Sequence, residues 1–294
     1  MIWEYYCFAR TPAHALELLV ENKGDARLIA GGTDLMFLLK DGSVKPKAMV
    51  DLGHVKELQE IQEANGFIKI GSMVTHKQLA SSELICSKVR ILAEAARSVG
   101  SPQIRNVGTI GGNVVSAQPA ADTSIALLAL GTKAFILTSQ GEEEKPLQET
   151  FVGPGKSAIN PAQELLTYFV FPSPGPSEAT AFARHARRKA LSLPILNVGI
   201  WLKMDDSRQV IEDIRIAMGP MAGVPFRALQ TESYLKGKTF TPEAMQNALE
   251  TAASEVNPRD SFRGGSQYKK EMVKVFLKRA LVSAVEELRG ENNG

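Results

Sequence analysis

Two short glycine-rich segments carry the residue types that could hold an anion. Gly108-Thr109-Ile110-Gly111-Gly112-Asn113 and Ala30-Gly31-Gly32-Thr33-Asp34 each place two adjacent glycines among small and polar residues. Paired glycines permit a backbone turn with φ > 0 and leave its outer surface free of Cβ atoms. Such a turn can aim several N–H groups at a phosphate. A tight turn between two strands would explain either segment alone, but two similar turns in one chain favour an anion site.

The other reactive side chains show no catalytic arrangement. Histidines and cysteines occur at unrelated positions without metal-ligand spacing, at His14, His54, His76, His185, Cys7 and Cys86. Asp34 and Asp122 each follow a small-residue segment and begin a predicted helix, so both are expected helix caps as well as candidate ligand contacts. The chain therefore looks built to hold a cofactor whose chemistry is not the protein's own.

The first glycine turn lies inside a predicted β-α-β unit. Arg27 to Ala30 is a short apolar strand, Asp34 to Lys40 a short helix, and Lys47 to Leu52 a second strand. Ligands of such units lie at the carboxyl ends of the strands, where the next helix offers free N–H groups. The glycine spacing matches neither the dinucleotide fingerprint G-x-G-x-x-G nor a Walker loop, so a nucleotide site here would be of another type.

Periodicity and turn residues predict the remaining elements. Helices are expected over 12–24, 75–79, 83–99, 125–130, 224–235, 243–256 and 267–288, and strands over 67–71, 133–138, 164–171, around 182, 198–204 and 210–218. The charged run 141–145 reads as a hairpin tip. The Pro/Ser/Gly-rich linker 173–177 is the clearest domain boundary. We therefore expect domains at 1–55, 56–175 and 176–290.

Composition excludes several classes of function. The 294 residues are 44% hydrophobic and 22% charged, with a formal net charge of +2, which gives no reason to expect nucleic acid or an anionic membrane as partner. No signal peptide and no apolar run of membrane-spanning length is visible, so the expected location is cytoplasmic. Two cysteines cannot hold an iron–sulfur cluster or a four-thiolate zinc site.

The two glycine segments together identify a family resemblance. Leu28 to Leu35 and Gln103 to Asn113 resemble the two FAD motifs of the medium subunit of molybdenum hydroxylases, a family that includes xanthine, nicotinate and aerobic carbon monoxide dehydrogenases. The resemblance runs the full chain. It implies an α+β fold with a FAD-binding part of the vanillyl-alcohol oxidase type, made of two α/β subdomains. A C-terminal α+β domain of three antiparallel strands and helices would follow.

The resemblance also assigns residues to FAD. The motif Leu28, Ile29, Ala30, Gly31, Gly32, Thr33 and Asp34 would bind the cofactor, its last five residues on the pyrophosphate, and Thr109, Gly111, Gly112 and Asn113 would form the other side of that cradle. Asp122 would contact ribityl or ribose hydroxyls. Val99 and Ile104 would line the adenine side, and Leu166 would lie against the isoalloxazine ring.

Two segments depart from the family pattern. In relatives these positions lie near the flavin and its acceptor site, so the departures are expected to concern the identity and rate of the electron acceptor more than FAD binding. Arg184 stands where relatives often have the lysine of a Lys-x-x-Arg-Arg pattern, and is included among the cofactor-binding candidates. Farther on, Leu191-Ser192-Leu193-Pro194 replaces a common Leu-Asp-Ile segment. A guanidinium keeps the positive charge but offers a different geometry from an ammonium.

The resulting expectation is an electron-transfer subunit of a heterotrimeric oxidoreductase. A large partner would carry the molybdenum cofactor and a small partner the 2Fe-2S clusters, and electrons would reach FAD here before passing to NAD+ or another acceptor. The expected substrate is xanthine or a related N-heterocycle. Alternatives are a nicotinate or carbon monoxide dehydrogenase subunit, a self-contained FAD oxidase, and a non-catalytic assembly protein.

Overall fold

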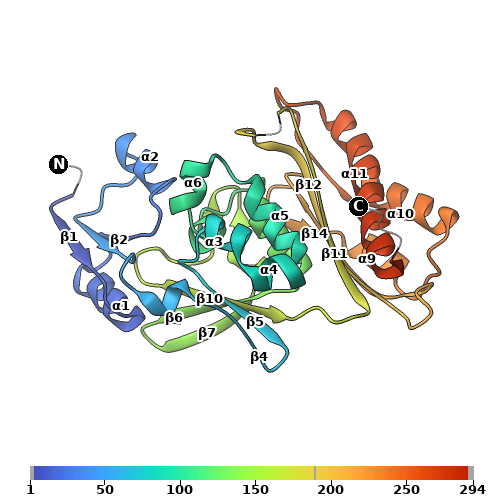
Figure 1. Cartoon of the computed structure of the whole chain (residues 1–294). Coiled ribbons are helices and arrows are strands. Elements are labelled where there is room, and N and C mark those ends of the chain that lie inside the picture. Colours follow the sequence, from blue (N-terminus) through green and yellow to red (C-terminus); the bar gives the residue numbers. More distant parts are fainter. Residues whose placement is uncertain (1–2, 189, 291–294) are drawn as a thin grey trace.

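The computed structural model describes residues 3–188 and 190–290, which form three successive units of helices and strands (Figure 1). The sheets have the orders β1-β3-β2, β4-β5-β10-β6-β7 and β11-β12-β13-β14, with a separate two-stranded pair β8-β9. This confirms the expected α+β class. The linker 173–177 lies between the second and third sheets, and the division at 1–55, 56–175 and 176–290 stays a prediction. No helix within the described residues is long and apolar enough to cross a membrane.

The first unit is the predicted β-α-β arrangement with one additional strand. Its elements are β1 (Tyr5–Phe8), α1 (Pro12–Glu21), β2 (Ala26–Ile29), α2 (Leu35–Lys40) and β3 (Ala48–Asp51). Strands β2 and β3 pair in parallel, and β1 pairs in parallel with the other side of β3. Helix α1 begins where expected, because the Thr11 side chain accepts from the His14 amide and Pro12 follows at the first helical position.

The second unit joins an antiparallel sheet to a group of short helices. Its elements are η1 (Lys56–Gln59), β4 (Ile61–Ala64), β5 (Phe67–Gly71), α3 (His76–Ser81), α4 (Glu83–Lys88), α5 (Arg90–Ser98), α6 (Pro102–Val107), α7 (Ile110–Val115), α8 (Asp122–Ala129), β6 (Lys133–Thr138), β7 (Gly141–Pro146), η2 (Leu147–Thr150), β8 (Phe151–Gly153), β9 (Lys156–Ser157) and β10 (Leu165–Pro172).

Two expectations for this unit were wrong. The single helix predicted over 83–99 is broken at Val89, whose φ of −131° and ψ of 55° end α4 before α5 begins. Val89 is fully buried at this break, and its β-branched side chain has a lower helix propensity than an unbranched one. The charged run 141–145 is strand β7, paired with β6, rather than a hairpin tip. Its acidic side chains lie at the sheet edge, where charge discourages pairing with another chain.

The third unit is a four-stranded antiparallel sheet with helices on one face. It contains β11 (Glu178–Ala186), β12 (Pro194–Met204), β13 (Ile211–Gly219), β14 (Phe226–Arg227), α9 (Leu229–Leu235), α10 (Pro242–Glu255) and α11 (Ser266–Arg289). Strand β14 is a fourth strand beyond the three predicted ones. Because it occupies part of the range expected to be helical from residue 224, helix α9 begins only at Leu229. Helices α11 and α9 pack on one face of the sheet, and α10 packs on these two helices (Figure 1). Helices α5 and α8 pack against the other face. Because both faces are covered, β12 is buried along nearly its whole length.

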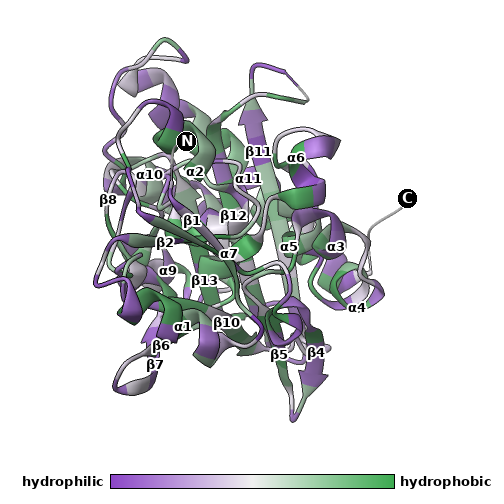
Figure 2. Ribbon diagram, turned by 90° about the vertical axis from the view of Figure 1, so that its left-hand side faces the viewer, coloured by the Kyte–Doolittle hydropathy of each residue, from purple (hydrophilic) through white to green (hydrophobic). Residues whose placement is uncertain are grey.

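Figure 2 looks onto the first unit with the other two units behind it. The view shows β4 in hydrophilic colour at the periphery, whereas α7 near the middle is mainly hydrophobic. This matches the burial of the elements, since Ile110 and Val114 of α7 are fully buried and most of β4 is exposed. Helix α7, which contains most of the second glycine segment, therefore packs in the core of the second unit, against α8, β9 and β10.

Candidate functional site

A large cleft runs between the three units. It has a volume of about 1990 Å³. Its walls include all the site residues expected from the sequence except Ile29, namely Leu28, Ala30, Gly31, Gly32, Thr33, Asp34, Val99, Ile104, Thr109, Gly111, Gly112, Asn113, Asp122, Leu166 and Arg184. Ile29 lies on β2 behind the turn, where its side chain faces Gly32. Residues scattered over most of the chain thus meet at one cleft.

The first glycine segment forms a turn with free amides. Gly32 has a φ of +67°, as expected for a left-handed turn. Among the described residues, the backbone N–H groups from Gly31 to Leu35 have no hydrogen-bond acceptor. Asp34 occupies the N-cap position of α2, but its side chain makes no capping bond, so the expectation of a capping role was wrong. The turn therefore offers a row of free donors, as anion-binding turns do.

The second glycine segment differs from the expected turn between strands. It joins α6 to α7, and Gly111 and Gly112 belong to α7 without positive φ. The amides from Ile110 to Asn113 already have acceptors: Ile110 donates to the Val74 carbonyl, Gly111 to the Ser72 carbonyl, Gly112 to the Thr109 hydroxyl and Asn113 to the Thr109 carbonyl. From Ile110 to Asn113 the second segment therefore brings no free backbone N–H groups to the cleft, contrary to the expectation from its glycines.

Close packing explains the glycines of both segments. A Cβ atom on Gly31 would lie 2.0 Å from the carbonyl oxygen of Val107, and one on Gly111 would lie 2.6 Å from the carbonyl oxygen of Ser72. Both distances are far inside van der Waals contact, so neither position accepts a side chain without movement of the backbone. Gly31 thus lets the first segment touch the second directly.

The Asn113 side chain can offer hydrogen-bond donors to the cleft, although the backbone amides from Ile110 to Asn113 are already hydrogen-bonded within the protein. Its Oδ1 accepts hydrogen bonds from Thr123 Oγ1 at 2.8 Å and Ser124 Oγ at 3.2 Å. Its amide nitrogen has no acceptor among the described residues. Asn113 is half-buried in the cleft wall. With the oxygen held by α8, the amide can present its two N–H donors to the cleft.

Asp122 forms an ion pair rather than a helix cap. Ala121 is the N-cap residue of α8, so the predicted capping role of Asp122 was wrong. Oδ1 of Asp122 accepts from Arg184 Nε at 3.0 Å and from Asn197 Nδ2 at 2.9 Å. Burial raises the pKa of the Asp122 carboxyl above its ordinary value, while the nearby charge of Arg184 and the hydrogen bond from Asn197 oppose the rise.

Arg184 also holds the segment that departs from the family pattern. Its terminal nitrogen donates to the backbone carbonyl of Ser192. A guanidinium can serve Asp122 and Ser192 at the same time because its donors point in fixed, different directions. Leu191 and Leu193 beside this contact are each 60% exposed and line the cleft. The arginine therefore fixes both a buried carboxylate and a cleft-lining loop.

The remaining expected residues provide apolar wall. Val99 ends α5, Ile104 on α6 is 38% exposed, and Leu166 on β10 is nearly buried. All three line the cleft but come from separate elements. The cleft thus combines a polar strip of free amides with apolar surfaces, which is the usual make-up of a cofactor site.

Comparison with protein-family models decides the family. Residues 3–174 match the FAD binding domain in molybdopterin dehydrogenase, and residues 181–284 match the CO dehydrogenase flavoprotein C-terminal domain. The chain belongs to the FAD-binding subunits of the molybdopterin dehydrogenases. The predicted family, its oxidoreductase class and its FAD-binding domain are thereby confirmed.

Individual members of this family match over nearly their whole length. The nicotinate dehydrogenase FAD-subunit of Eubacterium barkeri is 33% identical over 90% of each chain. The glyceraldehyde dehydrogenase medium chain of Sulfolobus acidocaldarius is 30% identical over 94% of this chain and 96% of its own. A structure of carbon monoxide dehydrogenase from Hydrogenophaga pseudoflava that lacks the Mo-pyranopterin moiety superposes with a TM-score of 0.90, 28% identity and 96% coverage of both chains.

His76 lies in the wall of this cleft, although nothing in the sequence pattern indicated a site at this residue. The backbone amide of His76 donates to the Gly108 carbonyl at 3.0 Å, and its side chain is 2% exposed in the cleft wall. Burial, with a smaller contribution from Arg105, lowers the pKa of His76 to about 4. The imidazole is therefore neutral at neutral pH. Spacing along the chain gave no signal, because this contact is made only by the fold.

The third unit also contributes a segment that the sequence did not indicate. Arg259, Phe262 and Arg263 line the cleft from the loop before α11, and Phe262 is 79% exposed. The buried Lys269 supports this loop, because its Nζ donates to the Arg259 carbonyl at 2.5 Å and to Ser261 Oγ at 3.0 Å. The C-terminal unit thus forms part of the cleft itself.

Proposed function

We propose that this chain binds FAD in the cleft and acts as the electron-transfer subunit of a molybdenum hydroxylase. The observation that carries the proposal is the row of free amides from Gly31 to Leu35, in a cleft also lined by the Asn113 side chain. A diphosphate needs several fixed donors, and this arrangement supplies them without any further side chain. The family match supports the same cofactor.

The size of the cleft fits a dinucleotide cofactor. Its volume of about 1990 Å³ exceeds the roughly 300–1,000 Å³ of an ordinary small-molecule pocket. At Gly31 and Gly111 the backbone packs so closely that a side chain would push the neighbouring segments apart. The residues present therefore fit FAD, and we assign its pyrophosphate to Ala30 to Asp34 and to Asn113.

The rest of the proposed assignment follows from position in the cleft wall. The Asp122 carboxylate would accept from ribityl or ribose hydroxyls through Oδ2, which has no partner among the described residues. Val99 and Ile104 would line the adenine, and Leu166 the isoalloxazine ring. Leu28 would be part of the apolar wall. Ile29 does not line the cleft, and its side chain would instead support the turn at Gly32. Thr109, Gly111 and Gly112 would shape the site through their backbone.

The chain's own residues hold and orient the cofactor but perform no acid–base chemistry. The chemistry that FAD supplies when bound is electron transfer from the 2Fe-2S clusters of a small partner chain to NAD+ or another acceptor. A large partner would carry the molybdenum cofactor and the substrate. The relatives are medium chains and FAD subunits of dehydrogenases, which supports such an assembly. We also keep the cytoplasm as the proposed location.

The substrate of the complex is a further part of the proposal. We propose xanthine or a related N-heterocycle, supported by the nicotinate dehydrogenase relative. The glyceraldehyde and carbon monoxide relatives act on very different molecules at a similar level of identity, so this subunit does not itself select the substrate. Arg184 and Ser192 line the cleft, where they would affect the choice of acceptor.

The proposal is tested by reconstituting the purified chain with FAD. We expect stoichiometric binding with flavin absorbance and no turnover of small alcohols by the isolated chain. Absence of binding would overturn the proposal and favour an assembly protein. Steady oxidation of alcohols would instead favour a self-contained oxidase. Metal analysis of the chains that co-purify with the subunit would identify the molybdenum and iron–sulfur partners.

A further inference from the structure

The hydrogen bonding of the Asn113 side chain controls which way its amide points. Thr123 Oγ1 and Ser124 Oγ both donate to Oδ1, and both residues are fully buried in the first turn of α8. In this orientation Oδ1 accepts from both hydroxyls and the amide nitrogen keeps its two N–H donors for the cleft, whereas a flipped amide would spend those N–H donors on the hydroxyl oxygens. Asn113 itself is only half-buried, so packing alone does not set its orientation.

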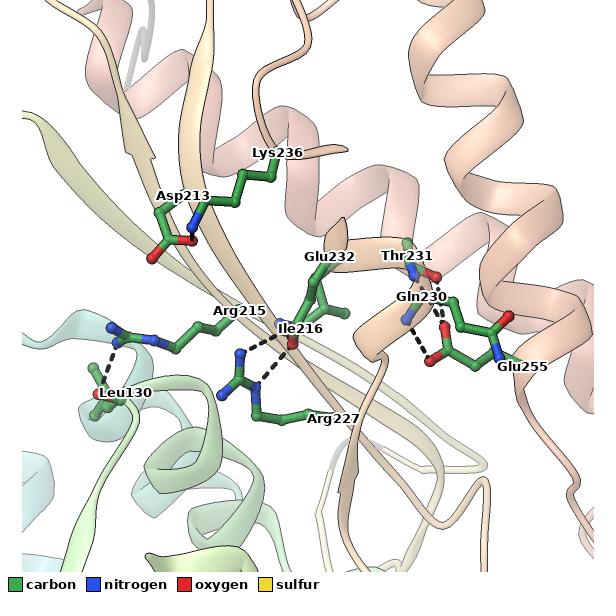
Figure 3. Close-up of polar contacts among 10 residues, drawn as sticks. All are labelled: Leu130, Asp213, Arg215, Ile216, Arg227, Gln230, Thr231, Glu232, Lys236 and Glu255. Atoms are coloured by element: carbon green, nitrogen blue, oxygen red, sulfur yellow. Dashed lines mark hydrogen bonds and ion pairs between the residues drawn. The ribbon is translucent and has the colours of Figure 1, made fainter. Parts of the chain in front are cut away.

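Helix α8 is held at both ends by the C-terminal sheet. At its first residue, Asp122 accepts from Arg184 of β11 and Asn197 of β12. At its far end, Arg215 of β13 donates to the Leu130 carbonyl at 3.1 Å (Figure 3). A carboxylate at the N-terminus and a guanidinium at the C-terminus both complement the helix dipole. The helix that carries the two hydroxyls is thus fixed by the third unit.

Arg215 has further support that keeps it in place. Its guanidinium lies 4.0 Å from the centre of the Trp201 ring on β12. A Cβ atom on Gly131 would lie 2.9 Å from an Arg215 terminal nitrogen, so glycine after α8 leaves room for the guanidinium. The neighbouring Arg227 is paired separately with Glu232, as Figure 3 shows. The Arg215 guanidinium is therefore held beside the C-terminal end of α8, where it donates to the Leu130 carbonyl.

We propose that Thr123 and Ser124 are positioning residues that turn the Asn113 amide so that its N–H donors, and not its oxygen, face the FAD diphosphate. This inference rests on the proposed FAD site. Without the hydroxyls the amide oxygen could rotate toward the cleft, where it would repel an anion. The C-terminal sheet thereby contributes to cofactor affinity through α8, whose Thr123 and Ser124 side chains hold the Asn113 amide.

A double-mutant cycle on FAD affinity tests this role. Thr123→Val removes the hydroxyl at nearly constant shape, Thr123→Ser keeps it, and Asn113→Ala removes the group being positioned. We expect Thr123→Val to weaken FAD binding about tenfold in the wild-type background, with near wild-type affinity for Thr123→Ser. In the Asn113→Ala background, Thr123→Val should cause no further loss. Flavin fluorescence titration measures each affinity.

The outcomes separate this inference from the proposed function. If the wild-type chain binds no FAD, the proposed function itself fails. If the wild-type chain binds FAD but Thr123→Val weakens binding equally in both backgrounds, or not at all, the positioning role is wrong. Thermal unfolding of the FAD-free proteins shows whether Thr123→Val folds, and Ser124→Ala in the same cycle replaces it if it does not.

Discussion

Arg184 donates from Nε to Oδ1 of Asp122 across 3.0 Å, and this ion pair joins the C-terminal sheet to the first turn of α8. The two side chains are 13% and 7% exposed, so the pair is largely withdrawn from water. Such a pair is costly to break from one side, because the remaining charge stays buried without a partner. Its position beside the cleft ties the stability of the fold to the geometry of the site.

Replacing Arg184 should destabilise the chain, and methionine should do so more than lysine. Arg184→Met leaves Asp122 without its counter-charge and should cost about 3 kcal/mol of unfolding free energy. Arg184→Lys keeps a charge but cannot reach Asp122 and Ser192 together, and should cost about 1 kcal/mol. Urea unfolding measures both. Arg187→Met, at an exposed neighbouring position, is the control and should change stability by less than about 0.5 kcal/mol. Equal stability of Arg184→Met and wild type would contradict a structural role for the ion pair.

Gly31→Ala should disrupt the contact between the two glycine segments. The new Cβ atom would meet the Val107 carbonyl oxygen at 2.0 Å, so one of the two backbones must move. We expect a loss of about 3 kcal/mol in urea unfolding together with weaker FAD binding. Gly175→Ala is the matched control, because its Cβ atom would meet nothing within 4 Å. A tolerated Gly31→Ala with normal FAD affinity would mean that the close approach is unnecessary.

Asn113→Asp should weaken FAD binding while preserving the hydrogen bonds from α8. The carboxylate can still accept from Thr123 and Ser124, but it replaces the amide donors with a negative charge beside the proposed diphosphate. The expected loss is about 2 kcal/mol, or roughly 30-fold in Kd, and it should be larger at low salt. Asn247→Asp on the exposed side of α10 makes the same charge change far from the cleft and should leave affinity unchanged. Unchanged affinity in Asn113→Asp would remove Asn113 from the diphosphate site.

His76 should make the chain less stable as the pH falls below neutrality. Its pKa is lowered from 6.5 to about 4 by burial, so the unfolded chain takes up a proton before the folded chain does. Stability from this group is complete above pH 6.5 and is lost progressively as the pH falls toward 4, by about 3 kcal/mol in total. Urea unfolding between about pH 7 and pH 4 measures the slope. His76→Gln should show a shallower slope, and identical slopes would contradict the burial of a neutral imidazole.

The sequence was sufficient for the family and for most elements, because these depend on local patterns. The β-α-β unit, the strands at 67–71 and 133–138 and the long C-terminal helices follow from periodicity and capping residues such as Thr11. The two glycine motifs together were specific enough to indicate FAD. All but Ile29 of the residues carried over from the resemblance line one cleft.

The features of the site that could not be predicted from the sequence depend on tertiary contacts. The glycine at 111 reads as a turn residue, but it is in a helix and is required by the close approach of Ser72. Asp122 reads as a cap, but its partners Arg184 and Asn197 lie far along the chain. His76 and the loop at Phe262 reach the cleft only through folding. These features have no local periodicity or spacing from which they could be inferred.

Hydrogen exchange of the backbone amides with and without FAD tests the proposed diphosphate site most directly. Without FAD, the amides from Gly31 to Leu35 have no acceptor among the described residues and should exchange fast, whereas those from Ile110 to Asn113 are already bonded and should exchange slowly. Adding FAD should slow exchange in Gly31 to Leu35 and change the second segment little. Stoichiometric FAD binding with no added protection at Gly31 to Leu35 would show that the diphosphate lies elsewhere and would contradict this assignment.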